Sequence, residues 1–358
     1  MLLIFIKIKQ KILKSQKIFF YMQNILNKKK TYFIAEAGVN HNGSFNEIKK
    51  LILNAKKCGA DAVKFQSFKT DEFLSTNKSI YKVKSNKIND TYKMFKKIEF
   101  QDTWYSKIYK ICKKVDIEFL TSVADINSAK IYFRYNNIVK IASEDIINYP
   151  LLEFLGKQKK KIIILSTGMA NENEIKKAIG ILKDNKIILM HCVSLYPTEL
   201  SEINLNRILE LKKKFKIEVG FSDHTIGLEA LIMAKSIGCR VYEKHFTINK
   251  NKKGPDHFLS LDPRETKKIV YIIKNYKEIF NDGLINPKTK EKEIALNTRR
   301  VIVANKEIKK GEVFSKDMIW LRRAGKGIHP RFLNEILGKK SNKDYSFNEK
   351  IIFKKYIK

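Results

Sequence analysis

The chain has 358 residues and a formal net charge of +35, from 72 Lys and Arg against 37 Asp and Glu. That length accommodates one large domain and a small one. Only nine of the basic residues are Arg, the lysines are spread along the whole chain, and we find no nucleic-acid-binding motif, so we expect no specific nucleic-acid partner. The sequence contains no run of about 18 apolar residues, so we predict no membrane span. Its four isolated cysteines favour a reduced, cytoplasmic setting.

The first 29 residues are predicted to be an extension ahead of the folded chain. Leu2 to Ile6 is apolar, but the charges follow it and no small-residue cleavage site comes after, which is the wrong order for a signal peptide. Met22 stands just before the first predicted strand. We therefore expect residues 1–21 to be disordered or to reflect a misassigned start.

Apolar, β-rich runs alternate with helical patterns from residue 32 to about residue 280. Strands alternating with helices of about 10–15 residues indicate parallel βαβ units, and eight such units are typical of a (β/α)8 TIM barrel. We therefore predict an α/β fold with a TIM-barrel domain over residues 30–280, in which an insertion at 70–100 helps to cover the catalytic face. The predicted strands span residues 32–36, 61–66, 117–121, 138–142, 161–166, 186–191, 217–221 and 240–244.

A second, small β-rich domain is predicted over residues 295–358. Residues 281–294 lack apolar periodicity and are interpreted as a linker. After the linker come short β-like runs at Arg300–Ala304 and Ile319–Leu321, separated by turn signals such as Lys310-Gly311.

Two histidines follow consecutive predicted strands. His224 and His245 would lie about 4.8 Å apart as strand neighbours, close enough to share one divalent ion. Packed histidines that only form hydrogen bonds are the alternative, but Asp223 and Glu243 beside them favour a metal site. Nitrogen and oxygen donors suit Mn²⁺, Mg²⁺ or Co²⁺ as well as Zn²⁺.

Lysines and hydroxyls mark several other strand ends. Lys64, Lys140 and Lys244 interrupt apolar strands, where a lysine needs a partner. They would bind phosphate or carboxylate, or one of them would form a Schiff base. The hydroxyls at further strand ends strengthen an anion pocket, and these are Ser143, Ser166 and Ser222. Glu36 stands at the end of the first predicted strand. It would act as an acid or a base, or bind a sugar hydroxyl; the alternative is a structural cap of the turn that follows.

Five segments together resemble the signatures of the sialic acid synthases, in the family's order and spacing, from about residue 30 to the C-terminus. They are Ala35-Glu36-Ala37-Gly38-Val39-Asn40-His41-Asn42-Gly43, Leu165-Ser166-Thr167-Gly168-Met169, Phe221-Ser222-Asp223-His224-Thr225, Glu243-Lys244-His245-Phe246-Thr247 and Gly254-Pro255-Asp256-His257. Two later segments resemble the family's C-terminal antifreeze-like (SAF) domain, namely Ile308-Lys309-Lys310-Gly311-Glu312 and Arg322-Arg323-Ala324-Gly325-Lys326-Gly327.

The resemblance implies that the chain condenses phosphoenolpyruvate with an N-acetylated amino-sugar aldehyde to give a nonulosonic acid and phosphate. It implies that His224 and His245 hold the metal, most readily Mn²⁺, and that Glu36 and Asp145 contact the sugar as catalytic residues. It assigns phosphoenolpyruvate to the positions Lys64, Lys140, Ser143, Ser166, Ser194 and Ser222. Contacts to the sugar and to metal-bound water are implied for Gln66, Tyr196 and Asp256.

The family also implies a domain-swapped homodimer, in which Arg323, or the adjacent Arg322, reaches the partner's sugar. Two departures from the family pattern bear on which sugar is used. Asp145, and not Glu144, falls on the sugar-contacting position, and Ser194 stands where some members have Asn. The leading substrate is N-acetylmannosamine, which would give N-acetylneuraminate. The alternative is a 2,4-diacetamido-trideoxy sugar, which would give legionaminate. The Gly254–His257 segment does not resemble the pseudaminate branch. A Schiff-base aldolase using Lys140 and a carbohydrate- or ice-binding protein are weaker hypotheses.

Overall fold

The computed structural model describes residues 25–27, 30–75, 91–280, 283 and 285–356. Residues 1–21, for which disorder or a misassigned start is expected, lie outside these described residues. The chain divides into two compact units, Met1–Phe280 and Asn281–Lys358. None of the described helices is both long and apolar enough to cross a membrane.

The first unit is a closed barrel of eight parallel strands in sequential order, as the sequence predicts. Each observed strand overlaps its predicted range, and β1 pairs with β8 to close the sheet. The strands are β1 Tyr32–Gly38, β2 Ala62–Ser67, β3 Glu118–Val123, β4 Ile138–Ile141, β5 Ile162–Ser166, β6 Lys186–His191, β7 Glu218–Asp223 and β8 Val241–His245.

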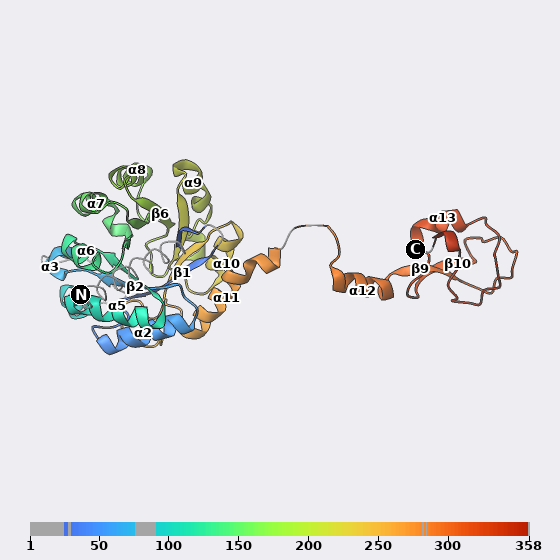
Figure 1. Ribbon diagram of the computed structural model, residues 1–358, viewed down its shortest axis with the longest axis horizontal. Helices are drawn as coiled ribbons and strands as arrows, with labels where there is room; N and C mark the ends of the chain where they lie inside the picture. Colours follow the sequence, from blue (N-terminus) through green and yellow to red (C-terminus); the bar gives the residue numbers. More distant parts are fainter. Residues whose placement is uncertain (1–24, 28–29, 76–90, 281–282, 284, 357–358) are drawn as a thin grey trace, which may run out of the picture. The chain divides into compact units, whose positions relative to one another are not determined.

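Helices surround the strands on the outside of the barrel (Figure 1). Their N-termini follow sequence rules: Ser44 caps the first of them through its side chain, and Asn171 with Glu174 forms a capping box. The helices are α2 Phe45–Lys57, α3 Thr70–Phe73, α4 Thr91–Ile98, α5 Asp102–Val115, α6 Ile126–Tyr132, α7 Tyr149–Gly156, α8 Glu172–Ile181, α9 Asn206–Phe215, α10 Glu229–Ser236 and α11 Pro263–Phe280, with short 3-10 helices at Ser143–Ile147 and Leu200–Glu202.

The barrel interior changes from apolar to polar along each strand. Side chains alternate between the two faces of a strand, so every second residue points inward. The lower inward positions form a buried apolar cluster that includes Ile34, Ile138, Ile164 and Val241. Ile25, from the predicted extension, is buried in the same cluster. Two residues further along these strands, the inward positions are Glu36, Lys140, Ser166 and Glu243. The apolar layer thus supports a polar layer at the carboxyl ends of the strands.

The second unit has its own core. Strands β9 Arg300–Ala304 and β10 Ile319–Arg323 pair antiparallel, where the sequence predicts short β runs. Buried residues such as Ile302, Phe314 and Tyr345 form a separate hydrophobic cluster. Helix α12, Thr289–Thr298, begins inside the predicted linker, and none of its residues is buried. Short helices at Pro330–Phe332, α13 Leu333–Ile336 and Lys354–Tyr356 complete the unit.

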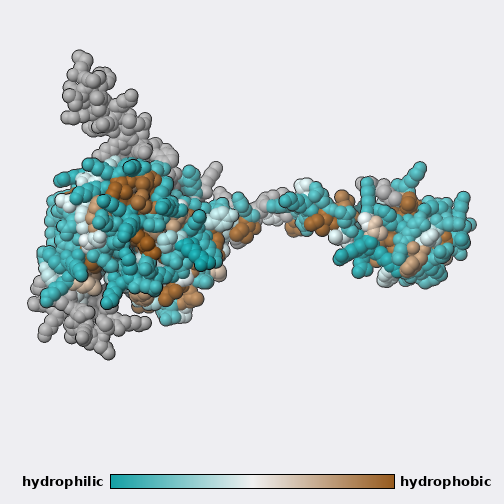
Figure 2. All heavy atoms as spheres, turned by 90° about the horizontal axis from the view of Figure 1, so that it is seen from below, coloured by the Kyte–Doolittle hydropathy of each residue, from teal (hydrophilic) through white to brown (hydrophobic). Residues whose placement is uncertain are grey.

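The visible surface is mostly hydrophilic, with separate apolar patches on the first unit (Figure 2). Several large apolar side chains are exposed on loops that follow barrel strands, among them Ile147, Met169, Leu200 and Ile226. They follow β4, β5, β6 and β7, on the side of the barrel to which the carboxyl ends of the strands point. An exposed apolar rim around a polar mouth is typical of a face that contacts another molecule.

One buried carboxyl makes the stability of the barrel dependent on pH. Glu118, at the start of β3, accepts a hydrogen bond from Asn136 at 2.8 Å through Oε1, whereas its Oε2 is buried without a hydrogen-bond partner. Burial raises the pKa of Glu118 to about 8, from 4.5. The folded state therefore keeps a proton that the unfolded state loses, and stability decreases as the pH rises from about 5 to about 8.

Glu118→Gln is expected to remove this dependence. Each unit of pKa difference corresponds to about 1.4 kcal/mol, so the variant should gain up to a few kcal/mol over the wild type at pH 8 and little at pH 5. Urea unfolding at both pH values measures the difference. Exposed Glu153→Gln is the control and should show no such pH-dependent gain. An equal effect of Glu118→Gln at both pH values would contradict the assignment.

Candidate active site

Four charged side chains form a buried network at the mouth of the barrel. Lys64 Nζ lies 2.9 Å from Glu36 Oε2 and 3.8 Å from Glu243 Oε2. Lys140 Nζ lies 3.6 Å from Glu243 Oε1. All four residues are almost completely buried. Two lysines at the carboxyl ends of neighbouring barrel strands offer hydrogen-bond donors to an anionic ligand.

The charges of this network stabilise one another. Burial by itself would lower the pKa of Lys64, but Glu243 and Glu36 outweigh it and raise that pKa. Burial by itself would raise the pKa of Glu243, but Lys140 and Lys64 outweigh it and bring that pKa below its usual value. Burial dominates at Glu36, whose pKa is raised in spite of Lys64. Glu243 is therefore the carboxyl of the network whose pKa the lysines lower, and Glu36 is the carboxyl whose pKa burial raises.

Hydroxyl and thiol groups gather on the side of Lys140. Lys140 Nζ donates to Ser166 Oγ at 2.6 Å, and Ser143 Oγ lies 3.0 Å from Cys192 Sγ. Gly168 leaves room for them: a Cβ there would lie 2.4 Å from Ser194 Oγ and 2.7 Å from Ser143 Oγ. Ser194 Oγ is buried without a hydrogen-bond partner among the described atoms. A cradle with spare donors beside a lysine suits a phosphate or carboxylate group.

The predicted histidine pair comes together at the opposite side of the mouth. The rings of His224 and His245 lie 5.6 Å apart, and Tyr196 stacks on His224 at 4.3 Å. His224 Nδ1 lies 2.7 Å from the carbonyl oxygen of Val193. Because a carbonyl oxygen only accepts, Nδ1 carries the proton and Nε2 keeps a lone pair. Burial lowers the pKa of both histidines, which favours neutral rings.

These side chains fit a divalent metal. His245 Nδ1 is buried without a hydrogen-bond partner and lies 3.5 Å from Asp256 Oδ2. Neutral imidazoles with free nitrogens beside a carboxylate form a donor set suited to Mn²⁺ or Zn²⁺. Within the described part of the chain, no group of three or more His, Cys, Asp and Glu side chains is arranged to hold a metal ion. An ion bound by the two histidine nitrogens would have further coordination positions for water or substrate.

The remaining predicted residues surround the space between these two groups. Gln66 Nε2 donates to Glu36 Oε1 at 3.0 Å. Gly38, at φ +48°, allows this approach, since a Cβ there would lie 3.2 Å from Glu36 Oε1 and 3.3 Å from Gln66 Nε2. Ser222 Oγ donates to Glu243 Oε1 at 3.0 Å, so its hydroxyl proton is directed to a carboxylate. Glu36 is thus held through Oε1 by the hydrogen bond from Gln66 and through Oε2 by its ion pair with Lys64, which together define the direction in which its carboxyl faces.

Asp145 lies in the 3-10 helix after β4 and is buried, whereas Glu144 is exposed. Asp145 Oδ1 accepts from Asn148 Nδ2 at 3.1 Å. Burial raises the pKa of Asp145 to about 7 in spite of that hydrogen bond. At neutral pH this carboxyl can therefore donate a hydrogen bond as well as accept one.

Two residues considered from the sequence lie elsewhere. Lys244 and Asp223 face away from the mouth, toward the helices, where Lys244 Nζ lies 2.6 Å from Asp223 Oδ2 and neither side chain is exposed. Strand alternation is the reason, because residues 243 and 245 share the inward face and residue 244 cannot. Lys244 is therefore neither an anion ligand nor a Schiff-base lysine in the site, and the carboxylate of Asp223 is bound to Lys244 behind the histidine pair.

Arg322 and Arg323 of the second unit differ in what they contact. Arg322 donates to Asn305 Oδ1 at 2.7 Å and lies 5.0 Å above the ring of Phe347, within its own unit. Arg323 is exposed and forms no hydrogen bond or ion pair with any residue that the structure describes. Of the two, Arg323 is the one available to an outside ligand.

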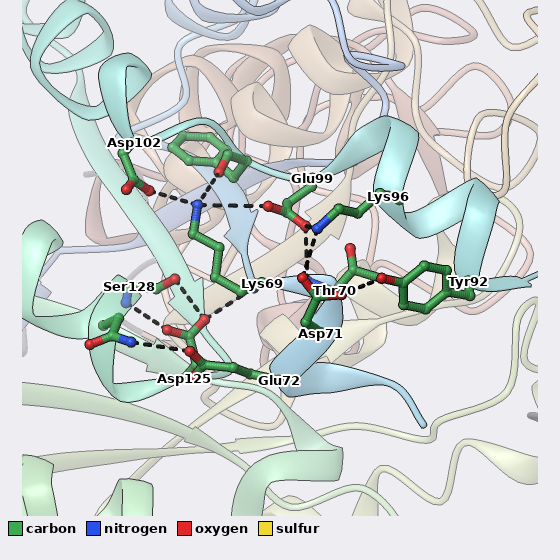
Figure 3. A network of polar contacts seen from close by, with 12 residues as sticks. Lys69, Thr70, Asp71, Glu72, Tyr92, Lys96, Glu99, Asp102, Asp125 and Ser128 are labelled. Carbon is green, nitrogen blue, oxygen red and sulfur yellow. Dashed lines mark hydrogen bonds and ion pairs between the residues drawn. The ribbon is translucent and has the colours of Figure 1, made fainter. Parts of the chain in front are cut away.

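A polar network fixes the chain that leaves β2 after Gln66 (Figure 3). Lys69 Nζ contacts Asp102 at 2.7 Å, and the backbone N–H of Lys69 donates to Asp125, which also caps α6. Thr70 N donates to Glu99 Oε2 at 3.0 Å. The two described ends of the predicted 70–100 insertion are thus bound to each other through Thr70 and Glu99, and Lys69 attaches them to Asp125 in the loop after β3. Residues 76–90 lie outside the described part.

Sequence reasoning missed two members of the site. Glu243 was associated with the histidines, but it lies between Lys64 and Lys140. Its inward position two residues before His245 is the signal that could have identified it. Cys192, one of the four isolated cysteines, was not predicted as a site residue, yet its thiol contacts Ser143 beside Lys140. Its position just after the end of β6 gives the corresponding signal.

The fold and the site define a TIM-barrel protein with an anion cradle and a histidine pair at the carboxyl ends of its strands. Comparison with known proteins gives a match to the NeuB family over residues 51–284 and to the SAF domain over residues 299–345. This chain belongs to the NeuB family and carries a C-terminal SAF domain, as its resemblance to the sialic acid synthases predicts.

Similar proteins span nearly the whole chain. N,N'-diacetyllegionaminic acid synthase of Campylobacter jejuni is 40% identical over 90% of this chain and 99% of its own. Pseudaminic acid synthase of the same species is 36% identical, with 91% and 96% covered. The N-acetylneuraminic acid synthetase structure from Leptospira borgpetersenii, in complex with citrate, has a TM-score of 0.67 and 32% identity and covers 75% of this chain and 90% of that one.

Proposed function

We propose that this protein condenses phosphoenolpyruvate with the open-chain aldehyde of an N-acetylated amino sugar, giving a nonulosonic acid and inorganic phosphate. The observation that carries the proposal is the pairing of two different subsites at one mouth. The Lys64 and Lys140 side, with its serine cradle, suits a small ligand bearing carboxylate and phosphate. The histidine side, with Glu36 and Asp256 nearby, suits an oxygen-rich acceptor.

The reaction follows from these positions. The lysines and serines would hold the carboxylate and phosphate of phosphoenolpyruvate, leaving its methylene carbon directed toward the sugar. A new bond forms between that carbon and the aldehyde carbon, and a proton is delivered to the aldehyde oxygen; Glu36, whose pKa burial raises, is the proposed donor. Water adds to the resulting cationic carbon and gives up one proton, which restores the donor. The bond between that carbon and the phosphate oxygen then breaks as the new hydroxyl becomes the ketone, and its proton leaves with the phosphate.

The proposal includes a divalent ion, most readily Mn²⁺, held by His224 and His245 with Asp256 close by. When bound, such an ion supplies a Lewis acid for the sugar's carbonyl oxygen. The free lone pair at His224 Nε2 and the unpartnered His245 Nδ1 support this role. Tyr196, stacked on His224, covers the ring and limits where the sugar can lie.

An aldolase that forms a Schiff base on Lys140 is less favoured. Its Nζ donates to Ser166 and lies 3.6 Å from Glu243 Oε1, so it is engaged by a hydroxyl and a carboxylate of the protein. A Schiff base needs a neutral amine, which this pairing opposes.

For the sugar, the relatives favour the 2,4-diacetamido-trideoxy acceptor over N-acetylmannosamine, which the sequence had favoured. The 40% identity over nearly full length to a legionaminic acid synthase supports the diacetamido sugar. The shorter Asp145, held by Asn148, also leaves more room on the sugar side than a glutamate would.

A substrate panel tests the function. Purified protein with Mn²⁺ and phosphoenolpyruvate is expected to release phosphate only when an N-acetylated amino sugar is added, with kcat/KM highest for the 2,4-diacetamido-trideoxy sugar. N-acetylmannosamine and the pseudaminate precursor are the comparison sugars, and Lys64→Ala is the inactive control. A higher kcat/KM for N-acetylmannosamine would reverse the order of sugars, and release with none of them would contradict the function.

We also propose a domain-swapped homodimer in the cytoplasm. The side chain of Arg323, unpartnered among the described residues, supports the domain-swapped dimer, together with exposed apolar side chains of the same unit such as Trp320 and Phe347. The four cysteines, all free and buried, support the cytoplasmic location.

A further inference from the structure

The buried pair of Lys244 and Asp223 lies directly behind the two histidines. Lys244 Nζ has three acceptors: Asp223 Oδ2 at 2.6 Å, the carbonyl of Thr225 at 2.7 Å and Thr225 Oγ1 at 3.2 Å. Asp223 Oδ1 in turn accepts from the N–H of Thr225 at 2.8 Å. Both charged side chains have no exposed surface, and the ammonium is fully satisfied.

This pair stands where the β7–β8 ladder stops. Asp223 and Lys244 are opposite one another in the register, and theirs is the last pair between these strands. His224 and His245 come immediately after it, so no further β7–β8 pairing holds the two rings together. Between Asp223 and Thr225 the chain must turn, and both of these residues are bound to Lys244.

The other attachments of the histidines lead in different directions. His224 is bound to the loop after β6 by two hydrogen bonds. Its ring Nδ1 bonds to the carbonyl of Val193, and its own carbonyl accepts from the N–H of Thr198. His245 pairs with Glu36 of β1, on the other side of β8. These attachments fix each histidine to its own neighbour and not to the other histidine. The two rings contact each other, and Tyr196 lies against both of them, at 4.3 Å from His224 and 5.9 Å from His245. Hydrogen bonds connect the two strand ends that carry these rings through Lys244, Asp223 and Thr225.

We infer that Lys244, Asp223 and Thr225 form a clamp that sets the separation of His224 and His245, and so positions the metal ligands without touching metal or substrate. The inference rests on the proposed metal role of the histidines. A buried ion pair adds little net stability because desolvation offsets its attraction, so geometric control is the better reason for an unexposed charge pair here. Groups that orient metal ligands typically change metal affinity by about 10–100-fold when lost.

The test uses the full-length protein and Mn²⁺ alone. The double variant Asp223→Asn/Lys244→Met removes both charges together, so that no unpaired charge remains buried. It is expected to fold, by circular dichroism, and to bind Mn²⁺ at least about tenfold more weakly than the wild type by electron paramagnetic resonance titration. Without metal, amide hydrogen exchange in peptides covering residues 221–227 should become faster.

The matched control lies at the other end of the same two strands. Arg240, just before β8, pairs with Glu218, at the start of β7, at 3.4 Å. Arg240→Met/Glu218→Gln should lower stability while leaving Mn²⁺ affinity and exchange at residues 221–227 unchanged. Thr225→Val is a milder clamp variant that keeps both charges, and it should weaken Mn²⁺ binding severalfold.

The outcomes separate the clamp from the proposed function. Unchanged Mn²⁺ affinity and unchanged exchange in the folded double variant would overturn the clamp. If that variant does not fold, unchanged Mn²⁺ affinity in Thr225→Val would overturn it. If the wild type itself does not bind Mn²⁺, the metal part of the proposed function fails, and exchange at residues 221–227 alone then decides the clamp.

Discussion

Replacing His245 with alanine is expected to lower kcat by about 10²–10³-fold in saturating Mn²⁺, because one of two protein nitrogens available to the metal is lost. His224→Ala should have a comparable effect. In both variants the Mn²⁺ concentration for half-maximal activity should rise, and steady-state phosphate release over a metal titration measures both changes. In the wild type, excess chelator should abolish activity and added Mn²⁺ should restore it.

His191 provides the control for this experiment. It is also a buried histidine at a strand end, but its Nε2 lies 2.7 Å from the carbonyl of Ile203 and its ring stacks on Phe221, away from the pair. His191→Ala should therefore lose stability while keeping the wild-type metal titration. Full activity of His245→Ala in excess chelator would rule out the metal assignment.

Mixing two inactive variants is expected to restore about a quarter of normal activity. Arg323→Ala lacks the guanidinium offered by the second unit, and Lys64→Ala lacks an anion ligand of the barrel. In a swapped dimer, one site of each mixed dimer combines an intact barrel with an intact second unit. Random exchange makes about half of the dimers mixed, and each then has one working site of two.

The recovered sites should keep the wild-type KM for the sugar, because all of their contacts are present. Verified subunit exchange, by mass spectrometry of differently labelled subunits, is required before activity is compared. Arg322→Ala is the matched control: since Arg322 is already bound to Asn305, its loss should mainly lower the stability of the second unit. No recovery after exchange would mean that Arg323 acts within its own chain or has no role.

The barrel and most of the site could be predicted from the sequence because both follow from local patterns. Most of the β-rich runs end on a polar residue or just before one, and parallel strands bring all of those ends to one face. That rule alone places Lys64, Lys140, Ser166 and the histidine pair together, as the structure shows. The apolar layer beneath them follows from the same alternation.

What the sequence did not predict depends on the face of a strand or on contacts between distant segments. Lys244 was considered beside Lys64, although alternation from His245 directs it outward to Asp223. The role of Glu243 between two lysines required the register of three strands. The hydrogen bond that ties Arg322 to Asn305, and so leaves Arg323 free, joins segments 17 residues apart. Helix α12 has no buried face, so it leaves no apolar periodicity to detect.

The central claim is that the site joins phosphoenolpyruvate to an amino-sugar aldehyde with release of its phosphate by carbon–oxygen cleavage. Phosphoenolpyruvate labelled with ¹⁸O at the bridging oxygen tests it most directly, with the 2,4-diacetamido-trideoxy sugar, Mn²⁺ and mass spectrometry of both products. The account predicts one ¹⁸O in the released phosphate and an unlabelled sugar acid containing all the carbons of both substrates. Label retained in the sugar acid or in free pyruvate, or a pyruvate adduct on Lys140 after borohydride reduction, would contradict it.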